Sequence, residues 1–159
     1  MGALLADKSV LIVAKKLDAL GVLRSQVTAL GATGVHVASS ANMALSMMRM
    51  LSFDICFIEN WLGDGEKNGY QVIEEAIHEG LKKAVHCHVL ILPEGSAGMA
   101  NDSLECFAES FFVKPIDPVL FASRLEKLIK LKQAIKPAEE LIDQGDHAGA
   151  LKVIAQLLR

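Results

Sequence analysis

Cysteine is scarce in this chain, and its few thiols lack the spacing of a metal site or a small disulfide framework. Cys56, Cys87 and Cys106 are odd in number, widely separated and set among apolar residues. Secreted domains that depend on disulfides are instead rich in closely spaced cysteine. The pattern therefore favours small buried thiols in a cytoplasmic protein.

A basic surface and a membrane-spanning segment are also missing. The net charge is −3, so the composition does not favour binding to a nucleic-acid backbone. No apolar run reaches the ~20 residues that a transmembrane helix needs, and the N-terminus lacks the pattern of a secretory signal. Because 52% of the 159 residues are hydrophobic, we expect a globular protein with a packed core. Together these features predict no membrane association and no direct nucleic-acid partner.

Short apolar runs alternate with helical patterns along most of the chain. The expected strands lie at 9–14, 35–38, 55–59, 88–92 and 111–113. The expected helices lie at 17–30, 41–50, 70–78, 97–107 and 119–135. Five strand–helix units with right-handed crossovers specify one parallel sheet that is covered by helices on both faces. The pattern predicts an α/β fold with a five-stranded parallel sheet.

The third expected strand is strongly apolar and stops at a carboxylate. Residues 55–58 are all apolar and precede Glu59, without the alternation of a half-exposed strand. A loop rich in glycine and charged residues, 63–69, follows it. Ligands of open α/β sheets bind just beyond the carboxyl ends of the strands. Glu59 therefore marks the predicted functional site.

These segments resemble the receiver domain of response regulators over about residues 8–130. The first strand, the strand that ends at Glu59, and residues 111–118, Phe-Phe-Val-Lys-Pro-Ile-Asp-Pro, carry the likeness. The resemblance implies a flavodoxin-like (βα)5 fold and a role in two-component or phosphorelay signalling. In that family an aspartate accepts a phosphoryl group with the help of Mg²⁺, so each position needs its own comparison.

Most positions that carry this chemistry are altered. The acidic pair that holds Mg²⁺ in the family corresponds to Ala14 and Lys15, whose side chains offer no oxygen ligand. Glu59 stands at the phosphoacceptor position, and its longer side chain displaces the carboxylate from the in-line geometry of phosphoryl transfer. Pro93 replaces the hydroxyl residue that ends the fourth strand. We therefore expect no metal and no cofactor.

Two positions keep the family pattern, since Lys114 matches its lysine and Phe111 its aromatic switch residue. Glu59 supplies one permanent charge that Lys114, together with Lys15 or Lys16, could neutralise without metal. We interpret this as a site fixed in one state. The alternative is an inherited ion pair that has no signalling role.

Two further features have more than one interpretation. Trp61, the only tryptophan, flanks the loop and is either an anchor for a partner or packed over the site. His86 and His88 lie two residues apart, but without a third ligand nearby we interpret them as polar residues at a strand edge rather than a metal pair.

Residues 131–159 predict a helix, a Gly-Asp turn and a second helix, with Pro137 as a break. This segment resembles part of a tetratricopeptide repeat, on the positions Gly145, His147, Ala150 and Ile154. A single hairpin cannot bury its apolar face alone. We expect it to continue into further repeats, to dock on the receiver-like part, or to pair with a second copy.

The predicted organisation is a degenerate receiver at 1–130 and a helical hairpin at 131–159. We expect a protein-interaction module, not an enzyme, with protein partners in a signalling pathway and a homodimer through the fifth helix and the hairpin. One alternative is a receiver that is still phosphorylated on Asp54, Asp64 or Glu59. Another is a purely structural dimerisation domain. Asp54 lies five residues of about 3.3 Å each before Glu59, far from the active edge.

Overall fold

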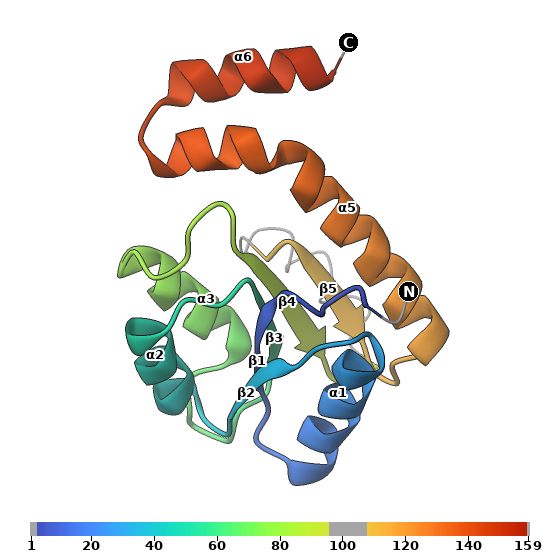
Figure 1. The fold of residues 1–159 in the computed structure, drawn as a ribbon. Coiled ribbons are helices and arrows are strands. Elements are labelled where there is room, and N and C mark those ends of the chain that lie inside the picture. The colour runs from blue at the N-terminus through green and yellow to red at the C-terminus, as the bar shows by residue number, and fades with distance from the viewer. Residues whose placement is uncertain (1–2, 96–107, 159) are drawn as a thin grey trace.

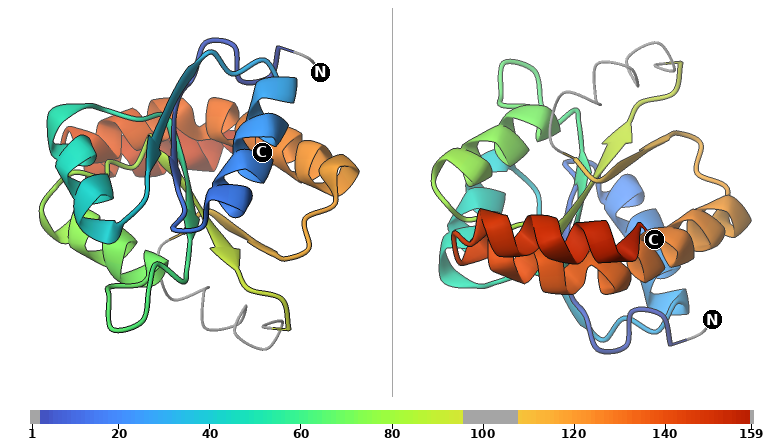
Figure 2. Two further views of the ribbon diagram at one scale, coloured as in Figure 1. Left: turned by 90° about the horizontal axis from the view of Figure 1, so that it is seen from below. Right: turned by 90° about the horizontal axis from the view of Figure 1, so that it is seen from above.

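A five-stranded parallel sheet in the order β2-β1-β3-β4-β5 forms the centre of the computed structural model, which describes residues 3–95 and 108–158 (Figures 1 and 2). Its strands are β1 (Ser9–Val13), β2 (Gly34–Ala38), β3 (Ile55–Glu59), β4 (Cys87–Leu92) and β5 (Ser110–Val113). Its helices are α1 (Leu17–Ala29), α2 (Ala41–Met50), α3 (Gly69–His78), α5 (Pro118–Asp143) and α6 (His147–Leu157). The predicted fold is confirmed. The helix expected at 97–107 lies outside the described residues.

β3 occupies the middle of the sheet, and all five of its residues are buried. Cys56 and Ile58 belong to the core cluster that α2 and α3 cover. Ile55 and Phe57 belong to the cluster on the other face, under α1 and α5. Figure 2 shows the helices on both sides of the sheet. Continuous apolar character, rather than alternation, follows from this two-sided burial.

Local signals mark the starts of two helices. The Ser40 hydroxyl accepts a hydrogen bond from the Met43 amide and caps α2. The Asp117 carboxylate caps α5 in the same way, through the Val119 amide at 2.8 Å, and Pro118 is the first helical residue. Each cap satisfies an amide that has no partner inside its helix.

The predicted helix end near residue 135 and the predicted break at Pro137 are both wrong. α5 continues through Pro137 to Asp143, and it changes direction in its second half (Figure 1). Proline removes one intrahelical hydrogen bond and crowds the preceding turn, which bends a helix without ending it when tertiary contacts hold both halves. Because α5 crosses the predicted boundary between 130 and 131, the division into two domains stays a prediction.

α6 folds back along the second half of α5 after a turn at Gly145, whose φ of 81° lies in the left-handed region. Asp146 caps α6 through the Gly149 amide. Ala138 and Ala150 are buried, at 1% and 2% exposure, and their small side chains let the two helices approach closely. The pair lies across the end of the sheet where the strands begin, opposite the end that carries Glu59 (Figure 1). Among the helices described, none combines the length and apolar character needed to cross a membrane.

Candidate functional site

The carboxyl ends of β1, β3, β4 and β5 bring together most of the predicted site residues. A cavity of about 170 Å³ opens at this edge of the sheet, which we call the carboxyl edge. It is lined by Lys15, Lys16, Ala19, Glu59, Trp61, Pro93 and Lys114. Four of the six residues predicted from the sequence thus meet in one place. Ala14 and Phe111 do not line the cavity.

Glu59 and Lys114 form the central contact of the site. The Lys114 Nζ lies 2.5 Å from the Glu59 Oε1, and the Glu59 side chain is only 6% exposed, against 33% for Lys114. Burial raises the pKa of the Glu59 carboxyl, and the contacts with Lys114 and the charge of Lys16 act in the opposite direction. The Glu59 carboxylate at the end of β3 is therefore held by the Lys114 ammonium group.

The beginning of α3 fixes the backbone around Glu59. Asn68 caps the helix through the Gln71 amide, while the Gln71 side chain accepts from the Asn68 amide, which is a complete capping box. A Cβ on Gly69 would lie 2.6 Å from the Glu59 carbonyl oxygen. Only glycine allows this close approach. The Asn-Gly pair is thus the sequence signal for this contact.

The residues at this edge do not fit the Mg²⁺ ion of the receiver family. Ala14 is fully buried, and its amide donates to the Ala38 carbonyl at 3.1 Å. The next position, Lys15, brings a cation where a hard metal ion requires oxygen ligands. In the stretches 3–95 and 108–158, no three His, Cys, Asp or Glu side chains group together as a metal site.

Trp61 forms one wall of the cavity. Its indole Nε1 donates to the Asp64 carboxylate at 3.0 Å, and the Lys16 Nζ lies 5.3 Å from the ring centroid. Such a cation above an aromatic face is attracted to the ring. The Trp61 side chain is still 41% exposed. One side of the ring is therefore packed over the site, and the other side is accessible as an anchor for a partner. The contact with Lys16 was not foreseen from the sequence.

The two alternative acceptors, Asp54 and Asp64, lie outside the cavity. The Asp54 Oδ2 accepts hydrogen bonds from the Ser9 amide at 2.8 Å and the Ser9 hydroxyl at 3.1 Å, at the opposite edge of the sheet. The Asp64 carboxylate accepts from Trp61 in the loop. Asp54 is therefore held at the far edge of the sheet, while Asp64 is held by Trp61, a residue of the cavity wall.

Phe111 lies at the start of β5 rather than at the cavity. Its half-buried side chain packs against the core cluster under α2 and α3. Its carbonyl oxygen accepts from the Arg124 Nη2 at 2.7 Å, and the Arg124 guanidinium stacks on the Phe112 ring at 4.2 Å. These contacts tie β5 to α5. The role of Phe111 as a switch stays a prediction.

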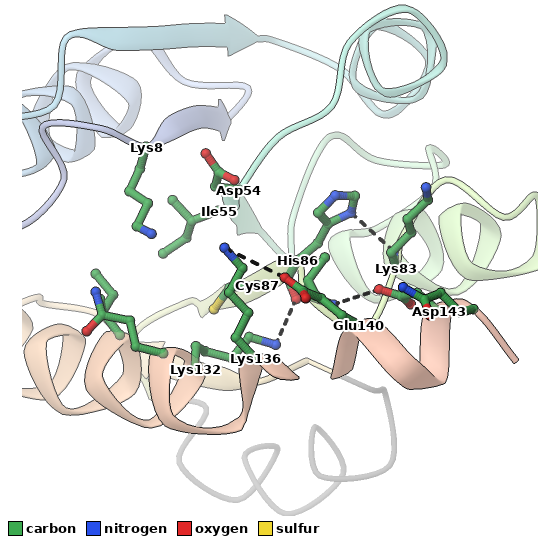
Figure 3. A pocket seen from close by; sticks show the side chains of 14 residues that line it. Lys8, Asp54, Ile55, Lys83, His86, Cys87, Lys132, Lys136, Glu140 and Asp143 are labelled. Atoms are coloured by element: carbon green, nitrogen blue, oxygen red, sulfur yellow. Dashed lines mark hydrogen bonds and ion pairs between the residues drawn. The ribbon is translucent and has the colours of Figure 1, made fainter. Parts of the chain in front are cut away.

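A larger cavity, of about 450 Å³, lies at the opposite end of the sheet, which we call the amino edge (Figure 3). There the second half of α5 contacts the loop before β4. The Lys132 Nζ donates to the carbonyl oxygens of Ala84 at 2.6 Å and His86 at 3.2 Å, and it pairs with Glu139 at 2.6 Å. Asp143 accepts from the Ala84 amide at 2.7 Å. We call this set of contacts the polar clasp.

The sequence reasoning did not identify the polar clasp. Lys132 and Glu139 are separated by seven residues, which places them two turns apart on one helix face. That spacing is the only signal of the polar clasp in the sequence, because Lys132 donates to backbone carbonyl oxygens in the loop before β4. The contact shows how the hairpin docks on the rest of the molecule.

Comparison with known proteins agrees with this architecture, although no family model matches the chain. The alginate biosynthesis transcriptional regulatory protein AlgB of Pseudomonas aeruginosa is 27% identical over 133 residues, which is 79% of this chain but 28% of the relative. A putative response regulator from Chloroflexus aurantiacus superposes with a TM-score of 0.69 at 19% identity, covering 77% of this chain and 98% of its own. A CheY-like receiver domain protein from Methanospirillum hungatei gives a TM-score of 0.67 at 19% identity, covering 79% and 96%.

The sheet order, the helices on both faces and these superpositions lead to one conclusion. The chain has the CheY-like fold of a response-regulator receiver domain, followed by a docked pair of helices.

Proposed function

We propose that this chain is a receiver-type signalling module that contacts protein partners in one fixed state, without phosphoryl transfer. The ion pair between Glu59 and Lys114 supports this proposal most directly. In a receiver, a phosphoryl group brings negative charge to the end of the third strand. Here a buried carboxylate already supplies a charge at that place, and the lysine already contacts it.

The surroundings of Glu59 support the same proposal. Phosphoryl transfer to a carboxylate depends on a metal ion and on donors placed around the phosphoryl oxygens. Ala14 and Lys15 supply no metal ligand, and Pro93 supplies no hydroxyl. The chain would therefore act as a pseudo-receiver and not as an enzyme. AlgB is named as a transcriptional regulator, but this chain matches less than a third of the length of AlgB. We therefore propose only a signalling role for this chain.

Treatment with a phosphodonor tests the proposal. In millimolar Mg²⁺, acetyl phosphate or beryllofluoride should leave the intact mass and the fluorescence of Trp61 unchanged, because the site lacks the ligands for the metal-bound phosphoryl group. A receiver with an intact acidic pair serves as the positive control. A stoichiometric mass gain on an Asp or Glu residue would support the alternative of an active phosphoacceptor.

The role of the charge itself is tested by partner binding. If Glu59 replaces phosphoaspartate, Glu59→Gln should weaken binding to the physiological protein partner, while Glu59→Asp, which keeps the charge, should retain more of it. If the ion pair is only inherited, both variants should bind as well as the wild type.

We also propose that a second copy of the chain is one partner, bound through the fifth helix and the tetratricopeptide-like hairpin. Large apolar side chains are exposed on the hairpin: Leu151 of α6 at 67%, Leu158 just past the end of α6 at 83%, and Ile142 near the end of α5 at 37%. A two-fold dimer would bury the same apolar side chains on both copies. In light scattering, the wild type should dimerise with rising concentration and Leu151→Ser/Leu158→Ser should not. A monomeric wild type at high micromolar concentration would contradict the dimer.

We propose a cytoplasmic location and no direct nucleic-acid partner for this module. The net charge of −3 supports the second point.

A further inference from the structure

The cavity at the amino edge has an apolar floor of four residues. The buried side chains of Ile55 in β3, Cys87 in β4 and Ile129 in α5 line it beside half-buried Val85. Burial raises the pKa of the Cys87 thiol to about 12, so this group stays uncharged. The volume of about 450 Å³ lies within the ~300–1,000 Å³ of pockets for small organic ligands. The cavity therefore has room and apolar surface for the body of such a ligand.

Charged side chains of both signs surround the apolar floor. They come from the segments before β1, β3 and β4 on one side of the cavity and from α5 on the other (Figure 3). The lysines are Lys8, Lys83, Lys132 and Lys136, and the carboxylates are Asp54, Glu140 and Asp143. Glu139 pairs with Lys132 at 2.6 Å and supplies a fourth carboxylate. Because the opposite charges balance, the cavity favours neither a simple anion nor a simple cation.

Most charges in and near this cavity are already engaged or screened. The polar clasp binds Lys132 and Asp143 to backbone groups of the loop before β4. Outside the lining, Lys82 pairs with Glu109. Asp7 is exposed and also lies outside the lining, so solvent screens its charge. We therefore expect none of these groups to contact a ligand in the cavity.

The charged groups that remain open occur in both signs. Within residues 3–95 and 108–158, Lys8 and Lys83 form no ion pair, and the Asp54 Oδ1 accepts no hydrogen bond. The Lys136 Nζ lies 3.9 Å from the Glu140 Oε1, which is too far for a hydrogen bond. Both ammonium groups and carboxylate oxygens are thus left to bind a ligand.

Lys8 and Asp54 are the best-placed pair of open groups. Lys8 immediately precedes β1 and Asp54 immediately precedes β3, and these two strands are neighbours in the sheet. The Asp54 amide donates to the Ser9 carbonyl at 3.0 Å, which fixes the two strand starts side by side. The Lys8 ammonium group and the Asp54 carboxylate nevertheless do not pair with each other. A ligand with a carboxylate and an ammonium group on one carbon atom can contact both at once.

We propose that this cavity binds a zwitterion with an apolar body, namely a free α-amino acid with a large apolar or aromatic side chain. Its carboxylate contacts the Lys8 ammonium group, and its ammonium group contacts the Asp54 Oδ1, both through charge-assisted hydrogen bonds. Its side chain contacts the apolar floor, which begins at Ile55, directly after Asp54. The inference goes beyond the proposed function, because it concerns the opposite edge of the sheet and requires no protein partner.

Calorimetric titration of the whole chain with L-phenylalanine tests the proposal, at constant pH and ionic strength. We expect one saturable site. Three analogues each lack one of the recognised groups: 3-phenylpropanoate lacks the ammonium group, 2-phenylethylammonium lacks the carboxylate, and glycine lacks the apolar side chain. Each analogue should bind at least about tenfold more weakly, because one set of groups in the cavity is left without a partner.

Two variants assign the charged contacts. Asp54→Asn keeps an oxygen that accepts from Ser9 but loses the charge. It should bind L-phenylalanine about tenfold more weakly than the wild type does, and 3-phenylpropanoate at least as well. Lys8→Ala should show the reverse selectivity, with weaker binding of L-phenylalanine and unchanged binding of 2-phenylethylammonium. Lys15→Ala, at the carboxyl edge, is the matched control and should bind L-phenylalanine like the wild type.

Absence of a saturable site for L-phenylalanine would overturn the proposal. Equal binding of L-phenylalanine and 3-phenylpropanoate by the wild type would also overturn it, as would equal binding of L-phenylalanine by the wild type and the Lys8→Ala/Asp54→Asn variant. The titration uses no protein partner and no phosphodonor, so a failure of the proposed function would leave all of these outcomes unchanged.

Discussion

The charged side chains at the carboxyl edge and at the amino edge of the sheet are arranged differently. At the carboxyl edge, side chains from neighbouring loops surround a small cavity, and a single buried ion pair joins Glu59 to Lys114. At the amino edge, the polar clasp joins α5 to backbone groups of the loop before β4. The carboxyl edge keeps two lysines open to solvent, whereas the amino edge uses most of its charges as internal contacts. The second arrangement fixes the position of the hairpin.

This comparison also explains how the hairpin is held. The Lys132 side chain is 13% exposed and so is that of Glu139. A hydrogen bond to a charged group contributes about 1.5–3 kcal/mol, which is more than an exposed ion pair contributes. These contacts hold the second half of α5 to the loop before β4.

The largest effect is expected at Lys114. Lys114→Met should lower the free energy of unfolding by about 3 kcal/mol at neutral pH, because the Glu59 carboxylate is left buried without its cation. Urea denaturation measures this change. Adding Glu59→Gln should recover most of the loss, since no buried charge then remains. If Lys114→Met costs less than about 0.5 kcal/mol, water already solvates Glu59 and the ion pair is not structurally important.

The next effect is expected at the polar clasp. Lys132→Met should lower the free energy of unfolding by about 2 kcal/mol, because two carbonyl groups and Glu139 lose their donor. Lys130→Met is the matched control on the same helix. Its ammonium group pairs with Glu126 on the surface and is 71% exposed, so the change should stay below about 0.5 kcal/mol.

Hydrogen exchange separates local from global effects at the clasp. The amides of Ala84 and Val85 donate to Asp143, so they should exchange faster in Asp143→Ala while the amides of β3 stay protected. Uniform acceleration across the sheet would show that the hairpin is an integral part of the core. Unchanged exchange at both amides would show that the clasp does not hold the loop.

The fold could be predicted because its signals are local and repeated. Apolar runs mark the strands, and Ser40, Asp117 and Pro118 mark helix starts. The continuation of α5 could not be predicted, since Pro137 is a local signal for a break and the contacts that override it come from residues 84–86, far away in the sequence. At Pro137, tertiary contacts outweigh the local tendency of proline to end a helix.

The site was predicted where topology alone determines it. Parallel strands place Glu59, Lys15 and Lys114 at one edge without knowledge of any side-chain conformation. The position of Lys16 above Trp61 depends on loop geometry, which the sequence does not specify. The interpretation of His88 as a polar residue at a strand edge was wrong, because β4 is covered on both faces and His88 is only 3% exposed.

A smaller effect on the free energy of unfolding is expected from a change of pH. Its sign is opposite for the titratable groups at the two edges of the sheet. Burial lowers the pKa of His86 and of His88 at the amino edge below the ordinary 6.5. Below about pH 6.5 these two histidines bind protons more readily in the unfolded chain than in the folded chain. The free energy of unfolding therefore falls as the pH drops. Burial raises the pKa of Glu59 above the ordinary 4.5, so its contribution to stability increases as the pH drops through its folded pKa.

Single variants resolve these two contributions. Between pH 7 and pH 5.5, His86→Asn should lose about 1 kcal/mol less stability than the wild type. Lys82 and Lys83 strengthen the depression of the His86 pKa, and Asp54 and Asp143 oppose it. Glu59→Gln should lose more stability than the wild type on acidification, because it cannot take up the proton. Thermal unfolding at a series of pH values measures both slopes, and parallel curves for all three proteins would contradict the assignment.

The smallest effect is expected from magnesium. The wild type should show no shift of its unfolding temperature in millimolar Mg²⁺, because among the residues that the structure describes Glu59 is the only carboxylate in the lining of the cavity. Lys15→Asp adds a second carboxylate to the lining of the cavity, and it also removes a competing cation. Stabilisation by about 0.4 kcal/mol is expected when the Mg²⁺ concentration equals the dissociation constant. The introduced carboxylate and Glu59 would then recreate part of a divalent-cation site, while Lys16→Asp, one residue further along, controls for the change in net charge. Equal responses of the two variants would show that charge alone, rather than the position of the missing oxygen ligand, determines the behaviour of this edge.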